Sequence, residues 1–150
     1  MPRPRFRLRA VVATCATVSA LTMTLAAQNS IRTVDKGAQS NVDDRLTAAA
    51  RTEAEWAPLW KKHNYDKPAP PVDFSKEMVV AVFMGSRPNA GFSTAVVSAT
   101  AANGALIVRY RETMPGPGTV SAQILTFPYH LVAIPRADVK DVKFEKDPAK

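Results

Sequence analysis

Cysteine and histidine are scarce in this sequence, and their scarcity narrows the chemistry open to the chain. Among 150 residues there is one cysteine, Cys15, and there are two histidines, His63 and His130. A single cysteine excludes an intrachain disulfide and a cysteine-rich metal site. Neither histidine has a second ligand at metal-binding spacing, and no HExxH, His-x-His or G-x-S-x-G motif occurs. We therefore expect no metal, no cofactor and no catalytic residue.

The N-terminus has the pattern of an export signal. Four arginines within the first nine residues precede an apolar stretch, 10–27, that ends in small residues. We expect residues 1–27 to be a cleaved signal peptide and residues 28–150 to form one exported domain, periplasmic or extracellular. The alternative is an uncleaved membrane anchor, since a bilayer is spanned by roughly 20 apolar residues. Cys15 follows Thr14 and precedes most of the apolar stretch, which does not fit a lipoprotein signal.

Little charge remains once the signal is set aside. Residues 28–150 hold 16 Lys and Arg and 13 Asp and Glu, a net charge of +3 against +7 for the whole chain. The basic pI is therefore largely a property of the export signal. No dense basic patch remains, so we do not expect nucleic-acid binding.

The segment that begins at Thr52 predicts the single helix. Thr52 and Glu55 match a capping box, and Trp56 and Trp60 follow at helical spacing. This spacing places both indoles on one face, so we expect them to be structural core residues. His63, at the end of the pattern, is expected to interact with the C-terminal helix dipole.

Short apolar or alternating runs separated by turn residues predict the strands. Asn103-Gly104 indicates a tight hairpin, because both central positions of a type I′ turn need positive φ, and Gly104 and Tyr129 are expected to be structural. The pattern predicts a monomeric α+β domain, with one N-terminal helix packed on an antiparallel sheet or open barrel of about five to seven short strands. The expected strands are 31–36, 78–84, 92–101, 105–112, 129–135 and 141–145, with 45–50 either a strand or the approach to the helix.

The stretch 77–97 is the centre of the pattern. The apolar run from Met78 to Met84 predicts a strand buried on both faces. After it comes a loop, 86–92, with Pro and Gly, and a second Pro- and Gly-rich loop spans 113–119. Loops made rigid in this way are suited to binding at low entropic cost, the alternative being that both are tight connections only. The candidate partner-binding residues are Arg87, Pro88, Asn89, Gly91, Phe92, Met114 and Pro115.

Several segments together resemble the C-terminal domain of the protease-complex subunit PrcB. They are TEAEWAPLWKKH, PPVDFSKEMVVAVFMGSRPNAGFS, LIVRYRE, PGPG and FPYHLVAIPR, in that order, within about residues 31–146. A member of that family is a bacterial surface lipoprotein that associates with a subtilisin-like protease and stabilises it. The resemblance implies an exported, non-catalytic accessory domain whose partner is an exported protease. Two features differ from what we expect of the family. A Gly-Gly-aromatic run is replaced by Asn89-Ala90-Gly91-Phe92, and the lipobox, the cysteine motif of a lipoprotein signal, is missing.

Two other functions fit parts of the pattern. The run Arg87 to Phe92 is similar to the N-P-T-T-G-[YF] loop of chagasin-type cysteine-protease inhibitors, which would act through loops 86–92 and 113–119. Those inhibitors are immunoglobulin-like sandwiches, into which a helix before the central strand does not fit well. The third function, a small periplasmic enzyme, would require His130 in a concave pocket with an acidic partner.

Overall fold

The computed structural model describes residues 30–148, so the predicted signal peptide lies outside the described residues. Within this range no helix is long and apolar enough to cross a membrane. One helix and seven strands follow one another in the order β1 (Arg32–Gly37), β2 (Leu46–Ala50), α1 (Glu53–His63), β3 (Glu77–Phe83), β4 (Ser93–Ala102), β5 (Ala105–Thr113), β6 (Tyr129–Pro135) and β7 (Asp141–Lys146).

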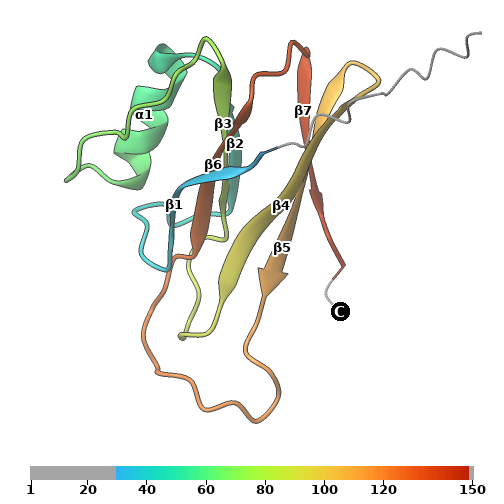
Figure 1. Ribbon diagram of the computed structural model, residues 1–150. Helices are drawn as coiled ribbons and strands as arrows, with labels where there is room; N and C mark the ends of the chain where they lie inside the picture. The colour runs from blue at the N-terminus through green and yellow to red at the C-terminus, as the bar shows by residue number, and fades with distance from the viewer. Residues whose placement is uncertain (1–29, 149–150) are drawn as a thin grey trace, which may run out of the picture.

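The strands form two sheets, and the helix adds a third layer (Figure 1). The first sheet has the order β1-β6-β3-β2 and is antiparallel throughout. In the second, β4-β5-β7, the β4–β5 pair is antiparallel and the β5–β7 pair is parallel. The helix covers the first sheet on the face away from the second sheet.

Three details of the predicted fold class need correction. The strands form two open sheets instead of one sheet or a barrel, and β5–β7 is parallel. The helix is not N-terminal within the domain, because β1 and β2 precede it. The segment 45–50, left open as strand or helix approach, is strand β2, which takes the edge position beside β3. The number of strands agrees with the expected range.

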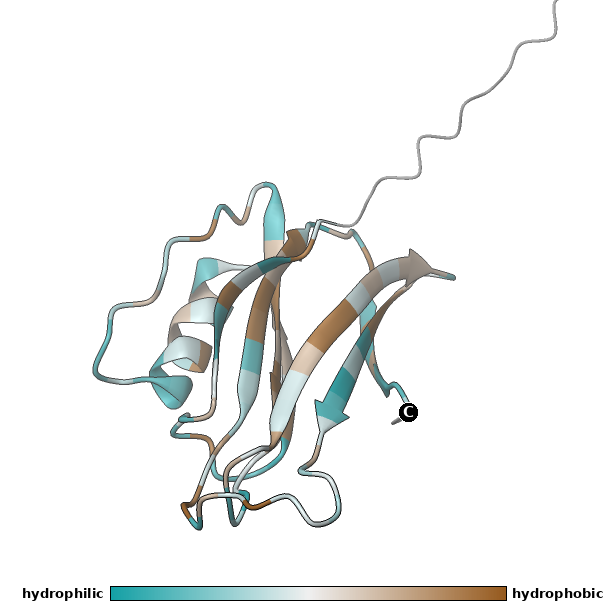
Figure 2. Cartoon of the chain, turned by 60° about the horizontal axis from the view of Figure 1, so that its bottom comes forward, coloured by the Kyte–Doolittle hydropathy of each residue, from teal (hydrophilic) through white to brown (hydrophobic). Residues whose placement is uncertain are grey.

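Strand β3 is central and buried on both faces, as its apolar run predicted. Met78, Val80 and Val82 face the second sheet, where they meet residues such as Val108 and Leu106. The alternate residues of β3 face the helix and contact Trp56. Side chains alternate along a strand, so only a continuous apolar run can pack against a layer on each side. Figure 2 shows the brown, apolar stretches concentrated on the strands in the middle of the molecule.

The helix is fixed by its cap and its two tryptophans. Thr52 Oγ1 accepts a hydrogen bond from Glu55 N, while the Glu55 carboxylate accepts from Arg51 N instead of from the cap residue itself. The buried indoles of Trp56 and Trp60 donate to the carbonyl oxygens of Pro70 and Lys67 at 3.1 and 2.7 Å. The tryptophans therefore also hold the proline-rich connector, whose carbonyls have no helical partner.

The β4–β5 hairpin turns at Asn103-Gly104, with φ of 52° and 75°. Both angles are positive, as a type I′ turn requires. On β5, Leu106, Val108 and Tyr110 face the first sheet, and the arginines of the strand face outward. The hairpin carries one irregularity, an extra residue in β4 between Val96 and Ser98.

Candidate functional site

Two long loops meet at one end of the domain. The β3–β4 loop (residues 84–92) and the β5–β6 loop (residues 114–128) both lie at the lower end in Figure 1. A Cβ atom built at Gly91 would stand 2.9 Å from Pro115 Cγ, so the loops touch at this point. The structure therefore brings together the two sequence segments that were expected to bind a partner.

Main-chain hydrogen bonds hold the two loops side by side. Arg87 and Thr126 exchange both backbone bonds, at 2.7 and 2.9 Å, and Ala90 N donates to Ala122 O at 2.9 Å. Thr126 is buried, and its hydroxyl donates to Asn89 O at 3.0 Å. The β5–β6 loop has little regular structure, but these bonds fix its second half against the β3–β4 loop.

The candidate residues of the β3–β4 loop lie in different environments. The Arg87 guanidinium stands 6.0 Å from the centre of the Phe92 ring, and both residues are half-buried. Arg87 therefore lies within cation–π distance of Phe92, whose ring is only partly available to a partner. Pro88 and Gly91 are exposed, while the buried Oδ1 of Asn89 has no hydrogen-bond partner among residues 30–148.

The β5–β6 loop carries an exposed apolar surface that the sequence reading missed in part. Met114 is 64% exposed, Val120 99%, Ile124 51% and Leu125 56%. Met114 was a candidate residue, but no function was predicted for residues 120–126. A usable signal was present, because no Asp, Glu, Lys or Arg occurs from Thr113 to Pro135. We call Met114, Val120, Ile124 and Leu125 the apolar loop surface.

A cavity of about 450 Å³ adjoins this surface and is lined by residues 111–117. Its wall includes Glu112, whose side chain is 3% exposed. Arg45 donates two hydrogen bonds to the Glu112 carboxylate, and Lys146 Nζ lies 2.6 Å from it. Burial acts to raise the pKa of Glu112, but the two cations outweigh it and leave the pKa below its usual value.

His63 is the last residue of α1, as expected, and it is buried in a hydrogen-bonded cluster. Its Nδ1 lies 2.8 Å from Ser40 Oγ, and its Nε2 lies 3.2 Å from Asp35 Oδ2. Burial lowers the pKa of His63 although Asp35 opposes the shift. The neutral ring donates from Nε2 to Asp35 and accepts the Ser40 hydroxyl hydrogen.

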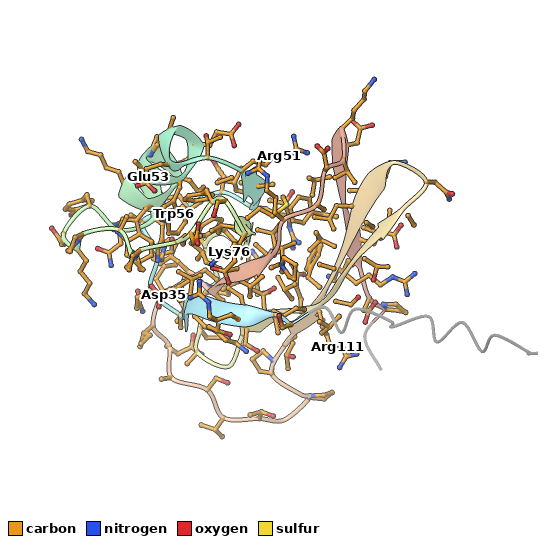
Figure 3. All side chains as sticks on the ribbon, turned by 45° about the horizontal axis from the view of Figure 1, so that its top comes forward. Asp35, Arg51, Glu53, Trp56, Lys76 and Arg111 are labelled. Atoms are coloured by element: carbon orange, nitrogen blue, oxygen red, sulfur yellow. The ribbon has the colours of Figure 1, made fainter. Side chains whose placement is uncertain are left out.

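The Ser40–His63–Asp35 chain has the residue types of a nucleophilic triad, which sequence order did not reveal. However, Ser40 is 8% exposed, and its oxygen also accepts from Val42 N at 3.2 Å. These hydrogen bonds connect the loop after β1 to the end of the helix. Figure 3 shows Asp35 and Trp56 on the helix side of the molecule and Arg111 on the opposite side.

Tyr129, also expected to be structural, packs beside this cluster. Its ring centre lies 4.2 Å from that of His63 and 6.4 Å from that of Phe83. Burial, with the nearby charge of Asp35, raises the pKa of Tyr129 to about 12. Tyr129 therefore joins β6 to the helix layer as a neutral phenol.

His130 does not have the surroundings that the enzyme alternative requires. It is buried between the sheets, where Nδ1 accepts from Val96 N at 2.9 Å and Nε2 lies 3.0 Å from Thr33 Oγ1. Its hydrogen-bond partners among residues 30–148 are thus a hydroxyl and a backbone amide. The ring is a structural hydrogen-bonding group in β6.

Comparison with known proteins gives a match to a family model. No curated protein and no solved structure gives a significant match to the chain. Residues 78–135 match the family model described as PrcB C-terminal. These residues form β3, β4, β5 and β6 together with both loops of the candidate site. In this segment the chain is similar to the PrcB C-terminal domain family, the family that the sequence pattern resembled.

Proposed function

We propose that the chain is an exported, non-catalytic accessory domain that binds a protein partner through its two adjacent loops. The observation that carries the proposal is the apolar loop surface: four large apolar side chains more than half exposed on one loop. Exposed apolar surface of this kind can mark an interaction site, and here four such side chains belong to one loop. The cavity at residues 111–117 offers a place for a partner's side chain.

The loops are suited to binding because they are held before a partner arrives. The exchange of backbone bonds between Arg87 and Thr126 and the contact of Gly91 with Pro115 restrict their motion. Ordering a loop in advance removes part of the entropic cost of association. The lack of charge from Thr113 to Pro135 favours an apolar patch on the partner over a charged one.

The proposed partner is an exported protease, which the domain would stabilise. Two observations support this choice: the export pattern of residues 1–27 and the match of residues 78–135 to the PrcB C-terminal family model. The proposed location, periplasmic or extracellular, rests on the same export pattern.

Affinity purification from the producing cells tests the proposal. The tagged chain is isolated from envelope and culture fractions, and co-purifying proteins are identified by mass spectrometry. We expect a protease that is retained by the wild type and lost with the double variant V120D/L125D. Tyr65→Asp is the matched control, because Tyr65 is also exposed, at 68%, but lies on the connector after α1. A partner retained equally by all three proteins would contradict binding through this surface.

Inhibition of cysteine proteases is the second candidate function. The contact of Gly91 with Pro115 favours it, because such an inhibitor must present loops 86–92 and 113–119 at one end. Titration against papain tests this candidate directly. We expect dose-dependent inhibition that is lost on changing Asn89-Ala90-Gly91, and no inhibition at micromolar concentration would remove the candidate.

A further inference from the structure

His130 joins the two sheets through a hydrogen bond to the main chain of β4. Its Nδ1 on β6 accepts from Val96 N at 2.9 Å, and both residues are buried. Because β4 and β6 belong to different sheets, this bond crosses the layer that apolar side chains otherwise fill.

The irregularity in β4 lies next to this bond. The pairing of β4 with β5 shifts between Val96 and Ser98, where one extra residue is inserted. Such a bulge bends its strand locally and disturbs the regular ladder. Here the Val96 amide donates to a side chain of the opposite sheet.

The hydrogen bonds determine which nitrogen of His130 carries the proton. A backbone amide can only donate, so Nδ1 must be the unprotonated acceptor. Nε2 then carries the hydrogen and donates to Thr33 Oγ1, 3.0 Å away on β1. Protonation would place a second hydrogen on Nδ1, so that two donors would face each other between Nδ1 and Val96 N.

Within residues 30–148, the hydrogen bonds of His130 reach no carboxylate that would stabilise a protonated ring. Its register partner on β3 is Val82, its register partner on β1 is Lys36, and β4 contributes the Val96 amide. Lys36 is the charged group that acts on the ring, and its charge opposes protonation. Burial is the larger cause, and together they lower the pKa of His130 to about 4.

The position of His130 connects this bond to both loops. The β5–β6 loop ends at residue 128, just before β6 begins, and the β3–β4 loop ends at residue 92, just before β4 begins. We propose that His130 is an acid-sensitive clamp, whose protonation releases β4 from the first sheet and so shifts the β3–β4 loop against the β5–β6 loop. The clamp follows from the geometry and does not depend on the proposed function.

Hydrogen exchange of the Val96 amide, followed by NMR on the full chain, tests the clamp. If the ring has a pKa near 6.5 in the open state and about 4 in the closed state, opening becomes roughly 30-fold more frequent between pH 7.5 and pH 5. We therefore expect protection of Val96, corrected for intrinsic exchange, to fall by about that factor. Val80, in the middle of β3, is the reference for global unfolding and should stay better protected than Val96 at both pH values.

His130→Asn is the matched variant, because its side-chain oxygen lies near the position of Nδ1 and does not titrate. We expect its Val96 protection to be the same at both pH values. An equal loss of protection in the variant and the wild type would overturn the clamp.

A second measurement keeps the test decisive if the variant does not fold. The imidazole nitrogen signals of His130 and the Val96 amide shift are followed in the wild type from pH 7.5 to pH 3.5. The clamp predicts one shared midpoint. A protonated His130 with an unchanged Val96 amide would contradict it.

Discussion

Gly91 lies directly against Pro115, and this contact joins the two loops of the candidate site. Gly91 has φ of 96°, and a methyl group at its Cα would meet Pro115 Cγ at 2.9 Å. Two requirements therefore coincide at this residue: a backbone conformation that side chains disfavour, and no room for a Cβ atom.

Gly91→Ala should destabilise the domain by about 1 to 2 kcal/mol, because it combines strain at positive φ with a clash. Gly118→Ala is the matched control, since Gly118 has φ of 75° but no atom within 4 Å of an added Cβ. Urea unfolding of both variants measures the difference. If the clash with Pro115 causes part of the loss, adding Pro115→Ala to Gly91→Ala should recover some of the stability. Equal losses for Gly91→Ala and Gly118→Ala would argue against the contact.

Ser40→Ala should destabilise the domain by about 1 to 3 kcal/mol, because it leaves two buried groups without a partner. These groups are Nδ1 of His63 and the amide of Val42. Thermal unfolding measures the effect. The exposed Ser93 provides the control, and Ser93→Ala should change stability by less than about 0.5 kcal/mol. Similar melting temperatures for both variants would be unexpected.

Glu112→Gln should destabilise the domain at neutral pH by about 1 to 2 kcal/mol. The expected loss is smaller than for a fully buried ion pair, because Arg45 and Lys146 are about half exposed and solvent screens their charges. The folded pKa of Glu112 is lowered, so its contribution is present above the unfolded value of 4.5 and is lost as the pH falls through the folded pKa. Urea unfolding at pH 7 and pH 3.5 should show a smaller difference between wild type and variant at the lower pH. The exposed pair Arg109–Glu145 supplies the control, Glu145→Gln.

Acid should also weaken the fold through His130. Its folded pKa of about 4 lies below the unfolded value of 6.5, so the unfolded state binds more protons between these values. Stability from this residue is complete above pH 6.5 and falls by about 2 kcal/mol between pH 7.5 and pH 5. His63, whose pKa is also lowered, contributes in the same direction. Urea unfolding should show a smaller decrease for His130→Asn than for the wild type.

The double variant V120D/L125D should leave stability within about 0.5 kcal/mol of the wild type per substitution, because both side chains are more than half exposed. Binding to the partner identified by affinity purification should weaken by at least about tenfold, since a charge would be placed in an apolar contact. Titration calorimetry with Tyr65→Asp as control checks both expectations. Unchanged affinity would place the binding site elsewhere.

The sequence alone determined those features that depend on neighbouring residues. The seven-residue apolar run specified a strand buried on both faces, since no other pattern fills two layers from one strand. Asn103-Gly104 specified the hairpin turn through its two positive φ angles. Thr52 and the spacing of the tryptophans specified the helix and the face it buries.

Only the tertiary structure decided what depends on residues far apart in the chain. The division into two sheets and the parallel β5–β7 pair follow from contacts between strands that no local pattern encodes. The surroundings of the histidines were decided in the same way: Ser40 and Asp35 meet His63, and Val96 meets His130, only once the layers have packed. The two loops could be recognised in sequence by their prolines and glycines, but their contact at Gly91 and Pro115 required the folding of both sheets. Local conformation is set by each residue and its neighbours, whereas burial and partnership are set by the whole packed chain.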